Sequence, residues 1–167
     1  MEEVRILGID PGLNRCGWGV IIAQGSGLRF VACGLIRPDA KASLAERLAQ
    51  LFTGVQEIAR LHAPHASAVE ETYVNSNPRA ALVLGQARGV TLAALSCAGL
   101  PVAEYAPAVI KKGLVGTGRA DKDQVAFMVQ RLLPAAGKVT ADAADALAVA
   151  LTHAAHGAFA ARVGAKP

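Results

Sequence analysis

The chain has 167 residues, a length that suits one domain with a sizeable buried core. Apolar residues make up 53% of the sequence, which excludes an intrinsically disordered chain. The formal net charge is +4, a mildly basic balance that is by itself weak evidence for a nucleic-acid partner.

The sequence has no pattern typical of a targeting signal or a membrane span. The acidic start, Met1-Glu2-Glu3, leads directly into an apolar strand, unlike a signal peptide. The longest apolar stretches are interrupted before they reach about 18 residues. The three cysteines, an odd number without metal-ligand spacing, are Cys16, Cys33 and Cys97. We expect buried, reduced thiols in a soluble, cytoplasmic protein with no membrane partner.

The N-terminal third predicts three strands joined by short turns. Residues 4–10 form an almost continuous apolar run, as in a strand buried on both faces. Residues 16–24 form the second strand, and Gly25-Ser26-Gly27 is a hairpin signal before the third strand, residues 28–36. These strands should form an antiparallel meander.

A helix, a strand and a second helix follow. Ser43 and Glu46 have the spacing of a capping box, and the apolar periodicity after them predicts a helix that ends before Pro64. Residues 66–71 predict a fourth strand. Asn77-Pro78 begins the next helix, with Asn as the cap and Pro in the first turn.

The last third predicts a fifth strand and two further helices. The strand covers residues 101–106, and residues 111–118 form a basic loop or short helix. Asp121 caps a helix, with Gln124 three residues later. Thr140 begins a final helix that should run to about His156.

This order predicts an α/β fold. A meander followed by strand–helix crossovers gives a five-stranded mixed sheet flanked by helices, which resembles the ribonuclease H-like arrangement. We expect one domain over residues 1–158 and a short flexible tail over residues 159–167.

Four acidic residues have no evident structural role. Asp10 and Glu70 each end an apolar strand, and Asp142 and Asp145 share one face of a helix, where two like charges are destabilising without a cation. Carboxylate oxygens clustered at strand ends and a helix start are what Mg²⁺ or Mn²⁺ needs. Two such ions can cleave a phosphodiester. Glu104, inside the fifth strand, is ambiguous, and a structural role is favoured there.

Several strings together resemble the RuvC family of Holliday junction resolvases. They are Gly8-Ile9-Asp10-Pro11-Gly12, Val69-Glu70-Glu71, residues 84–89 (LGQARG) and residues 141–147 (ADAADAL). The resemblance covers about residues 5–155. It implies a crossover junction endodeoxyribonuclease that nicks four-way DNA junctions symmetrically, in recombination and DNA repair. It also implies a homodimer, two metal ions per subunit held by the four acids, and a branch-migration motor as partner.

Further residues are candidates for DNA contact. Four cations lie around a Gly-rich turn, where a solvated loop is the alternative to phosphate contact: Lys111, Lys112, Arg119 and Lys122. The resemblance matches Lys111 and Lys122 to basic residues required for cleavage. In the loop after Glu70, Tyr73 and Asn75 are placed to touch bases, and Arg79 to reach a phosphate. For Tyr73, packing at a strand end is the alternative, and the resemblance favours contact with the junction.

Two features leave alternatives open. The helix after Asn77 carries small residues at four-residue spacing, which indicates close approach of another backbone, either the chain's own sheet or a dimer partner: Ala81, Gly85, Gly89 and Ala93. His153 and His156 lie on the final helix without ligand spacing to the acids. A surface or interface role is favoured over orientation of a phosphate or water.

Two other functions compete with a nuclease. An actin-like or sugar-kinase phosphotransferase also begins with a strand ending in Asp-x-Gly, but its two lobes need more than 167 residues. A non-catalytic nucleic-acid-binding module would not need four clustered acids, which repel DNA unless they are neutralised.

Overall fold

The computed structural model describes residues 2–72 and 77–163, and the side chains as far as residue 157. The elements in chain order are β1 (Val4–Asp10), β2 (Cys16–Gln24), β3 (Gly27–Ile36), α1 (Leu44–His62), β4 (Ala66–Glu70), α2 (Pro78–Cys97), β5 (Val102–Tyr105), α3 (Pro107–Val115), α4 (Lys122–Leu132), the 3-10 turn η1 (Pro134–Ala136) and α5 (Ala141–Val163). Tyr73 and Asn75 lie outside the described residues.

The sheet is five-stranded and mixed. Its strand order is β3-β2-β1-β4-β5. The first three strands are antiparallel, whereas β4 pairs parallel with β1 and with β5. The predicted fold class is therefore confirmed.

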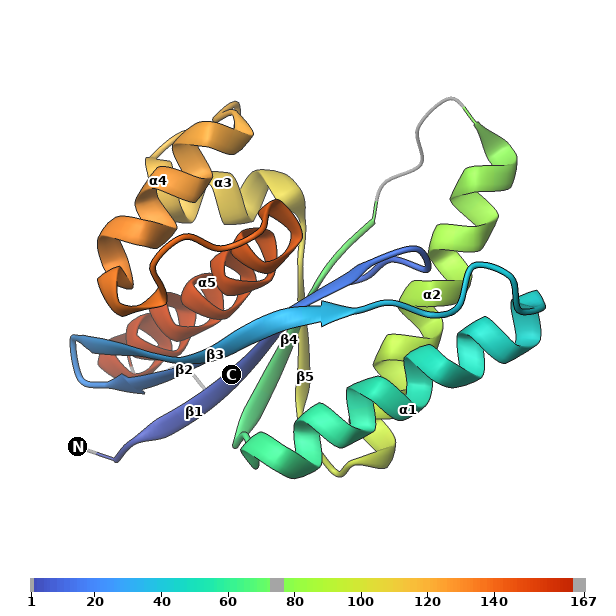
Figure 1. The fold of residues 1–167 in the computed structure, drawn as a ribbon. Coiled ribbons are helices and arrows are strands. Elements are labelled where there is room, and N and C mark those ends of the chain that lie inside the picture. The colour runs from blue at the N-terminus through green and yellow to red at the C-terminus, as the bar shows by residue number, and fades with distance from the viewer. Residues whose placement is uncertain (1, 73–76, 164–167) are drawn as a thin grey trace.

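Helices cover both faces of the sheet, as Figure 1 shows, with α1 and α2 on one side and α3, α4 and α5 on the other. Strand β1 divides its side chains between the two resulting cores. Ile6 packs with the α3, α4 and α5 side, while Leu7 and Ile9 pack with α1 and α2. This alternation places Asp10, like Ile6, on the α5 face of the sheet.

Helix α5 lies close against the sheet because glycines replace side chains beneath it. A Cβ atom at Gly8 would overlap the carbonyl oxygen of Ala146, and one at Gly17 would overlap that of Asp142. Glycine is the residue that allows such close approach of two backbones. The first turns of α5 are thereby held next to the end of β1.

The predicted caps are confirmed. Ser43 and Glu46 bond each other's backbone amides at 3.3 and 2.8 Å. Asp121 and Gln124 form a second capping box, at 2.8 and 3.0 Å. The side chain of Asn77 accepts from the first amides of α2.

Two expectations about helix bounds need correction. The segment after β5 is a helix that starts at Pro107, not at Lys111, because proline is favoured in the first turn. Helix α5 continues to Val163, past the predicted end near His156, since alanine favours helix and no proline interrupts it. The proposed domain limit at residue 158 thus falls inside a helix; how far the domain extends stays a prediction.

The cysteines are free, but they are not all buried. Cys16 is buried, Cys33 is half-buried and Cys97, at the end of α2, is exposed. By length and composition, α2 is also the one helix in the described residues that would be long and apolar enough to cross a membrane. That signal is weak, because helices of soluble proteins give it too.

Candidate active site at the strand ends

Two of the four predicted acids lie side by side at the carboxyl edge of the sheet. Asp10 ends β1 and Glu70 ends β4, and these strands are parallel neighbours with Ile9 opposite Val69. The two carboxyl groups share a hydrogen bond. Sequence position alone predicts this meeting, because the ends of neighbouring parallel strands lie at one edge.

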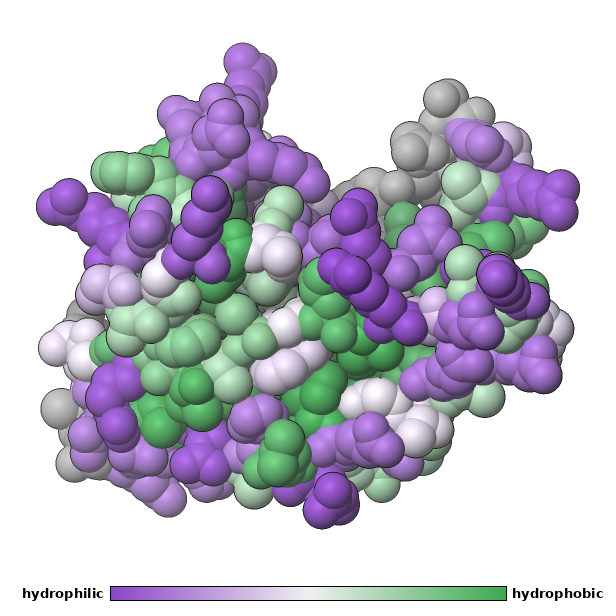
Figure 2. Space-filling model, viewed as in Figure 1, coloured by the Kyte–Doolittle hydropathy of each residue, from purple (hydrophilic) through white to green (hydrophobic). Residues whose placement is uncertain are grey.

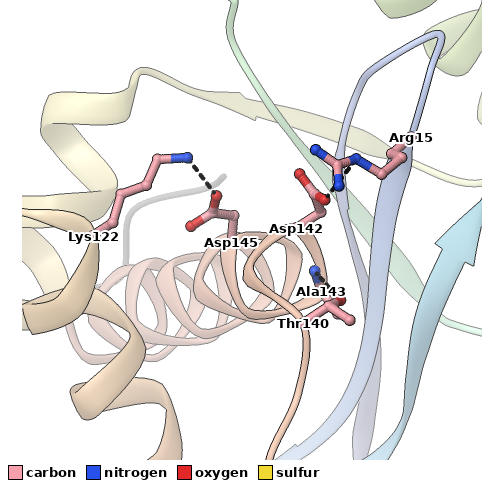
Figure 3. A network of polar contacts seen from close by, with 6 residues as sticks. All are labelled: Arg15, Lys122, Thr140, Asp142, Ala143 and Asp145. Atoms are coloured by element: carbon pink, nitrogen blue, oxygen red, sulfur yellow. Dashed lines mark hydrogen bonds and ion pairs between the residues drawn. The ribbon is translucent and has the colours of Figure 1, made fainter.

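The other two acids come from the start of α5. Asp142 Oδ2 lies 3.4 Å from Arg15 Nε, and Asp145 Oδ2 lies 3.4 Å from Lys122 Nζ. Figure 3 shows the two aspartates on successive turns of α5, with Arg15 approaching from one side and Lys122 from the other. Thr140 caps this end, accepting from the amide of Ala143 at 3.4 Å.

A cavity of about 260 Å³ joins three of these acids to two lysines. It is lined by Asp10, Glu70, Asp145, Lys111 and Lys122, with apolar side chains of α3, α4 and α5 behind them. Asp142 is not part of this lining, but its charge acts on Asp10. The structure therefore gathers all four acids around one place.

Burial and mutual repulsion disfavour the ionised forms of these acids. Burial, and then the neighbouring Glu70, raise the pKa of Asp10 to about 8. Burial also raises the pKa of Glu70 and of Asp145. The nearby Asp145 carboxylate raises the pKa of Lys122, which stays charged. More positive charge than the two lysines provide is needed before all the acids ionise near neutral pH.

The donor set fits a hard divalent cation in its chemistry. Carboxylate oxygens are the ligands that Mg²⁺ and Mn²⁺ prefer, and because the pKa values of three of these acids are raised, added positive charge would favour their ionised forms. Among the described residues, no three His, Cys, Asp or Glu side chains form a closed ligand cage as they stand. Asp142 and Asp145 instead turn toward Arg15 and Lys122.

The predicted DNA contacts differ in their relation to this cavity. Lys111 and Lys122 line it, whereas Lys112 and Arg119 are exposed and outside its lining. Arg79 is exposed in the first turn of α2. Figure 2 shows a hollow at the upper edge of the molecule with hydrophilic side chains on both of its sides.

The ambiguous residues have structural partners. Glu104 forms an ion pair with Arg88 of α2, which accounts for a carboxylate inside β5. His153 Nδ1 lies 2.9 Å from the Tyr105 hydroxyl, and the His156 ring packs edge-on against Tyr105 at 5.0 Å. These contacts give both histidines a partner within the chain, and His156 is exposed, so the favoured surface or interface role stays a prediction.

The small-residue stripe of α2 does not face the chain's own sheet. A Cβ atom added at Gly85 or Gly89 would meet nothing within 4 Å. Of the two alternatives for this stripe, packing on the sheet is therefore wrong.

Arg15 was not identified from the sequence as part of the site. A signal that could have found it is a cation five residues after Asp10, in the turn that leaves the strand end.

The sheet order, and the acids at the ends of its central strands, define the class of ribonuclease H-like nucleases. The family model for crossover junction endodeoxyribonuclease RuvC matches residues 6–153. The chain belongs to this family.

Similar proteins agree with that membership. The crossover junction endodeoxyribonuclease RuvC of Hyphomonas neptunium is 61% identical over 92% of both chains, and that of Azorhizobium caulinodans is 59% identical over 92% of this chain and 90% of its own. The solved structure of Thermus thermophilus RuvC in complex with Holliday junction substrate is 35% identical, covers 96% of both chains and has a TM-score of 0.85. Membership of a nuclease family answers the choice that the sequence left open against a phosphotransferase or a non-catalytic module.

Proposed function

We propose that this chain resolves four-way DNA junctions by paired, symmetric nicks, in homologous recombination and DNA repair. The observation that carries the proposal is the gathering of four acids around one cavity that also contains two lysines. Family membership and the fold shared with a RuvC bound to Holliday junction substrate support it.

Asp10, Glu70, Asp142 and Asp145 would hold two divalent ions, Mg²⁺ or Mn²⁺, in each subunit. Such ions activate a water for attack and stabilise the leaving oxygen of the phosphodiester. The acids of β1 and β4 contribute a rigid base, since both lie at the ends of buried strands. Those of α5 complete the set from the facing helix.

Lys111 and Lys122 are proposed to contact the phosphate that is cleaved. Both line the cavity, and the carboxylates beside them would otherwise repel DNA. Lys112 and Arg119 would contact phosphates further along the strand, and Arg79 would do so from α2. Tyr73 and Asn75, outside the described residues, are proposed to meet bases at the crossover.

The working unit is proposed to be a homodimer joined along α2. Gly85 and Gly89 face open space, and Leu82 beside them is 69% exposed. A two-fold axis at this helix would give two like active sites for the two strands of a near-symmetric junction. We further propose that the protein is soluble and cytoplasmic and acts with a branch-migration motor.

The direct test is incubation with a synthetic four-way junction and either Mg²⁺ or Mn²⁺, with a linear duplex of the same sequence as control. The expected products are paired nicks at symmetric positions, with the duplex left intact. Cutting of junction and duplex at equal rates would contradict selectivity for the junction.

Sedimentation at micromolar concentration tests the proposed dimer. A monomer that makes paired nicks would refute it.

A further inference from the structure

An arginine that the proposed site does not use stands beside its acids. Arg15 lies in the connection between β1 and β2, its side chain is 61% exposed, and its Nε lies 3.4 Å from Asp142 Oδ2. Figure 3 shows that Arg15 and Lys122 flank the two aspartates from opposite sides. The acids are thus bounded by cations on the β1–β2 side as well as on the α4 side.

Side-chain hydrogen bonds from helix α1 hold the connection that carries Arg15 in place. Arg47, in the first turns of α1, donates from Nη2 to the carbonyl oxygen of Leu13 at 3.2 Å and to Oδ1 of Asn14 at 2.7 Å. Leu13 itself is buried, with 4% of its surface exposed. Arg15 therefore extends from an anchored turn, and its location relative to the acids is set by packing.

A second exposed arginine lies at the same edge. The register of β2 and β3 pairs Cys16 with Ile36, so Arg15 and Arg37 both flank the last pair at this end of the two strands. The next charges along the chain are Asp39 and Lys41, whose side chains are exposed and which offset each other. The net charge of this rim is positive because of the two arginines.

The ion pair with Asp142 does not explain why an arginine is there. A single ion pair at 3.4 Å whose arginine is 61% exposed contributes little to stability. A guanidinium presents five N–H donors in a planar fork that matches phosphate oxygens, and the contact to Asp142 involves one of its three nitrogens. Lys111 and Lys122 lie on one side of the acids and Arg15 on the other, so a DNA strand that crossed the acids from the lysine side toward Arg15 would bring its next phosphates to the β1–β2 rim.

We propose that Arg15 binds a backbone phosphate of the cleaved strand on the β1–β2 side of the acids, and that Arg47 is a positioning residue for this contact. The inference rests on the proposed junction cleavage and adds a residue to it. Cations on both sides would hold the strand across the acids at two points. Contacts on both sides would fix the line along which the strand crosses the acids. Lysines on one side alone would hold it at one end only.

The first test compares junction binding by wild type, Arg15→Ala, Arg15→Gln and Arg29→Ala over 50 to 200 mM salt, with a chelator present so that no strand is cut. Arg29 is the matched control, since it is 63% exposed and pairs with Glu3 far from the acids. Loss of one phosphate contact lowers the slope of log affinity against log salt by about 0.9. The affinity lost by both Arg15 variants should therefore be about 3-fold larger at 50 mM than at 200 mM salt, whereas Arg29→Ala follows wild type.

A second test locates the contact. Neutral methylphosphonates replace single phosphates within a few nucleotides of the nick. At one of these positions wild type should lose affinity and Arg15→Ala should lose none, since the partner of that phosphate is already gone. Equal losses in both proteins at every position would overturn the proposal.

The alternative, that Arg15 only holds Asp142, predicts different results. Titration of the protein alone with Mn²⁺ would then change in Arg15→Ala, while the salt slope for DNA stayed at the wild-type value. That combination would refute the proposal. Failure of wild type itself to bind the junction would instead refute the proposed function.

The role of Arg47 is tested by non-additivity. Arg47→Met should weaken junction binding in the wild-type background and have almost no further effect in Arg15→Ala, because it acts through Arg15. Additive losses would mean that Arg47 does not position Arg15. The unfolding temperature of each variant, measured alongside, separates this result from loss of the fold.

Discussion

Helices α2 and α5 have similar composition and opposite surroundings. Both are rich in alanine and about twenty residues long. In α5 every residue from Ala146 to Thr152 is buried, whereas α2 buries only Ala87, Thr91, Ala94 and Leu95. The difference lies in where the glycines are. The sheet has glycines beneath α5, and these let the helix come close to the strands. The glycines of α2 are in the helix itself and face open space.

This contrast shows that a stripe of small residues does not by itself indicate which segment packs against it. The α5 contact is made within the chain and sets the positions of Asp142 and Asp145. At Gly85 and Gly89 of the α2 stripe, an added Cβ atom would meet nothing within 4 Å among the described residues. The predictions below test the two helices separately.

The largest effect is expected at the acids. Asp10→Asn and Glu70→Gln keep the size of the side chain but remove the charge that would bind a cation. Because a bound metal supplies several kcal/mol of transition-state stabilisation, cleavage should fall about 10³-fold or more. Binding of the junction, measured by gel shift, should survive because phosphate contacts come from other residues. Cleavage near the wild-type rate would refute the assignment.

The next effect concerns the close approach of α5. Gly8→Val would force side-chain atoms into the backbone at Ala146 and Ala150. Overpacking of this kind costs about 1–3 kcal/mol, measurable by urea unfolding. The control is Gly89→Ala on α2, where the added Cβ meets nothing. If both variants unfolded like wild type, the contrast between the helices would be wrong.

These two helices also show what the sequence could predict. Local patterns predicted three kinds of feature. Apolar runs predicted the strands, capping residues predicted the three helix starts, and acids without an evident structural role predicted the candidate site. The side of the sheet that α5 covers, and the outward direction of Gly85, depend on packing between distant segments. The pairing of Arg88 with Glu104 is likewise tertiary, and although its spacing from Asp10 puts Arg15 near the strand end, no local pattern shows that it meets Asp142 of α5.

The raised pKa of Asp10 predicts a pH dependence of stability without divalent metal. Its pKa is near 3.8 when unfolded and about 8 when folded, so the folded state binds the proton more tightly. The contribution of protonated Asp10 to the free energy of unfolding is fully present below pH 4 and is lost as the pH rises toward 8. The slope for this one group is below about 1.4 kcal/mol per pH unit. Urea unfolding of wild type and Asp10→Asn in chelator, from pH 5 to 8, measures it, and equal slopes would contradict the shift.

The smallest effect is expected on α2, and it separates the stability of the chain from that of the proposed dimer. Gly85→Ala should raise the free energy of unfolding by up to ~1 kcal/mol, because alanine favours helix and its Cβ has room. Gly85→Leu should also leave the subunit folded, since the space beside it is open. In a dimer packed along this stripe, however, leucine would hold the two backbones apart, and a loss of ~1.4 kcal/mol would weaken association tenfold. Sedimentation across a range of concentrations measures that shift. Junction cleavage should fall in parallel with the dimer fraction although all four acids are intact. Unchanged association in Gly85→Leu would place the subunit contact elsewhere and leave the open stripe of α2 for a different partner.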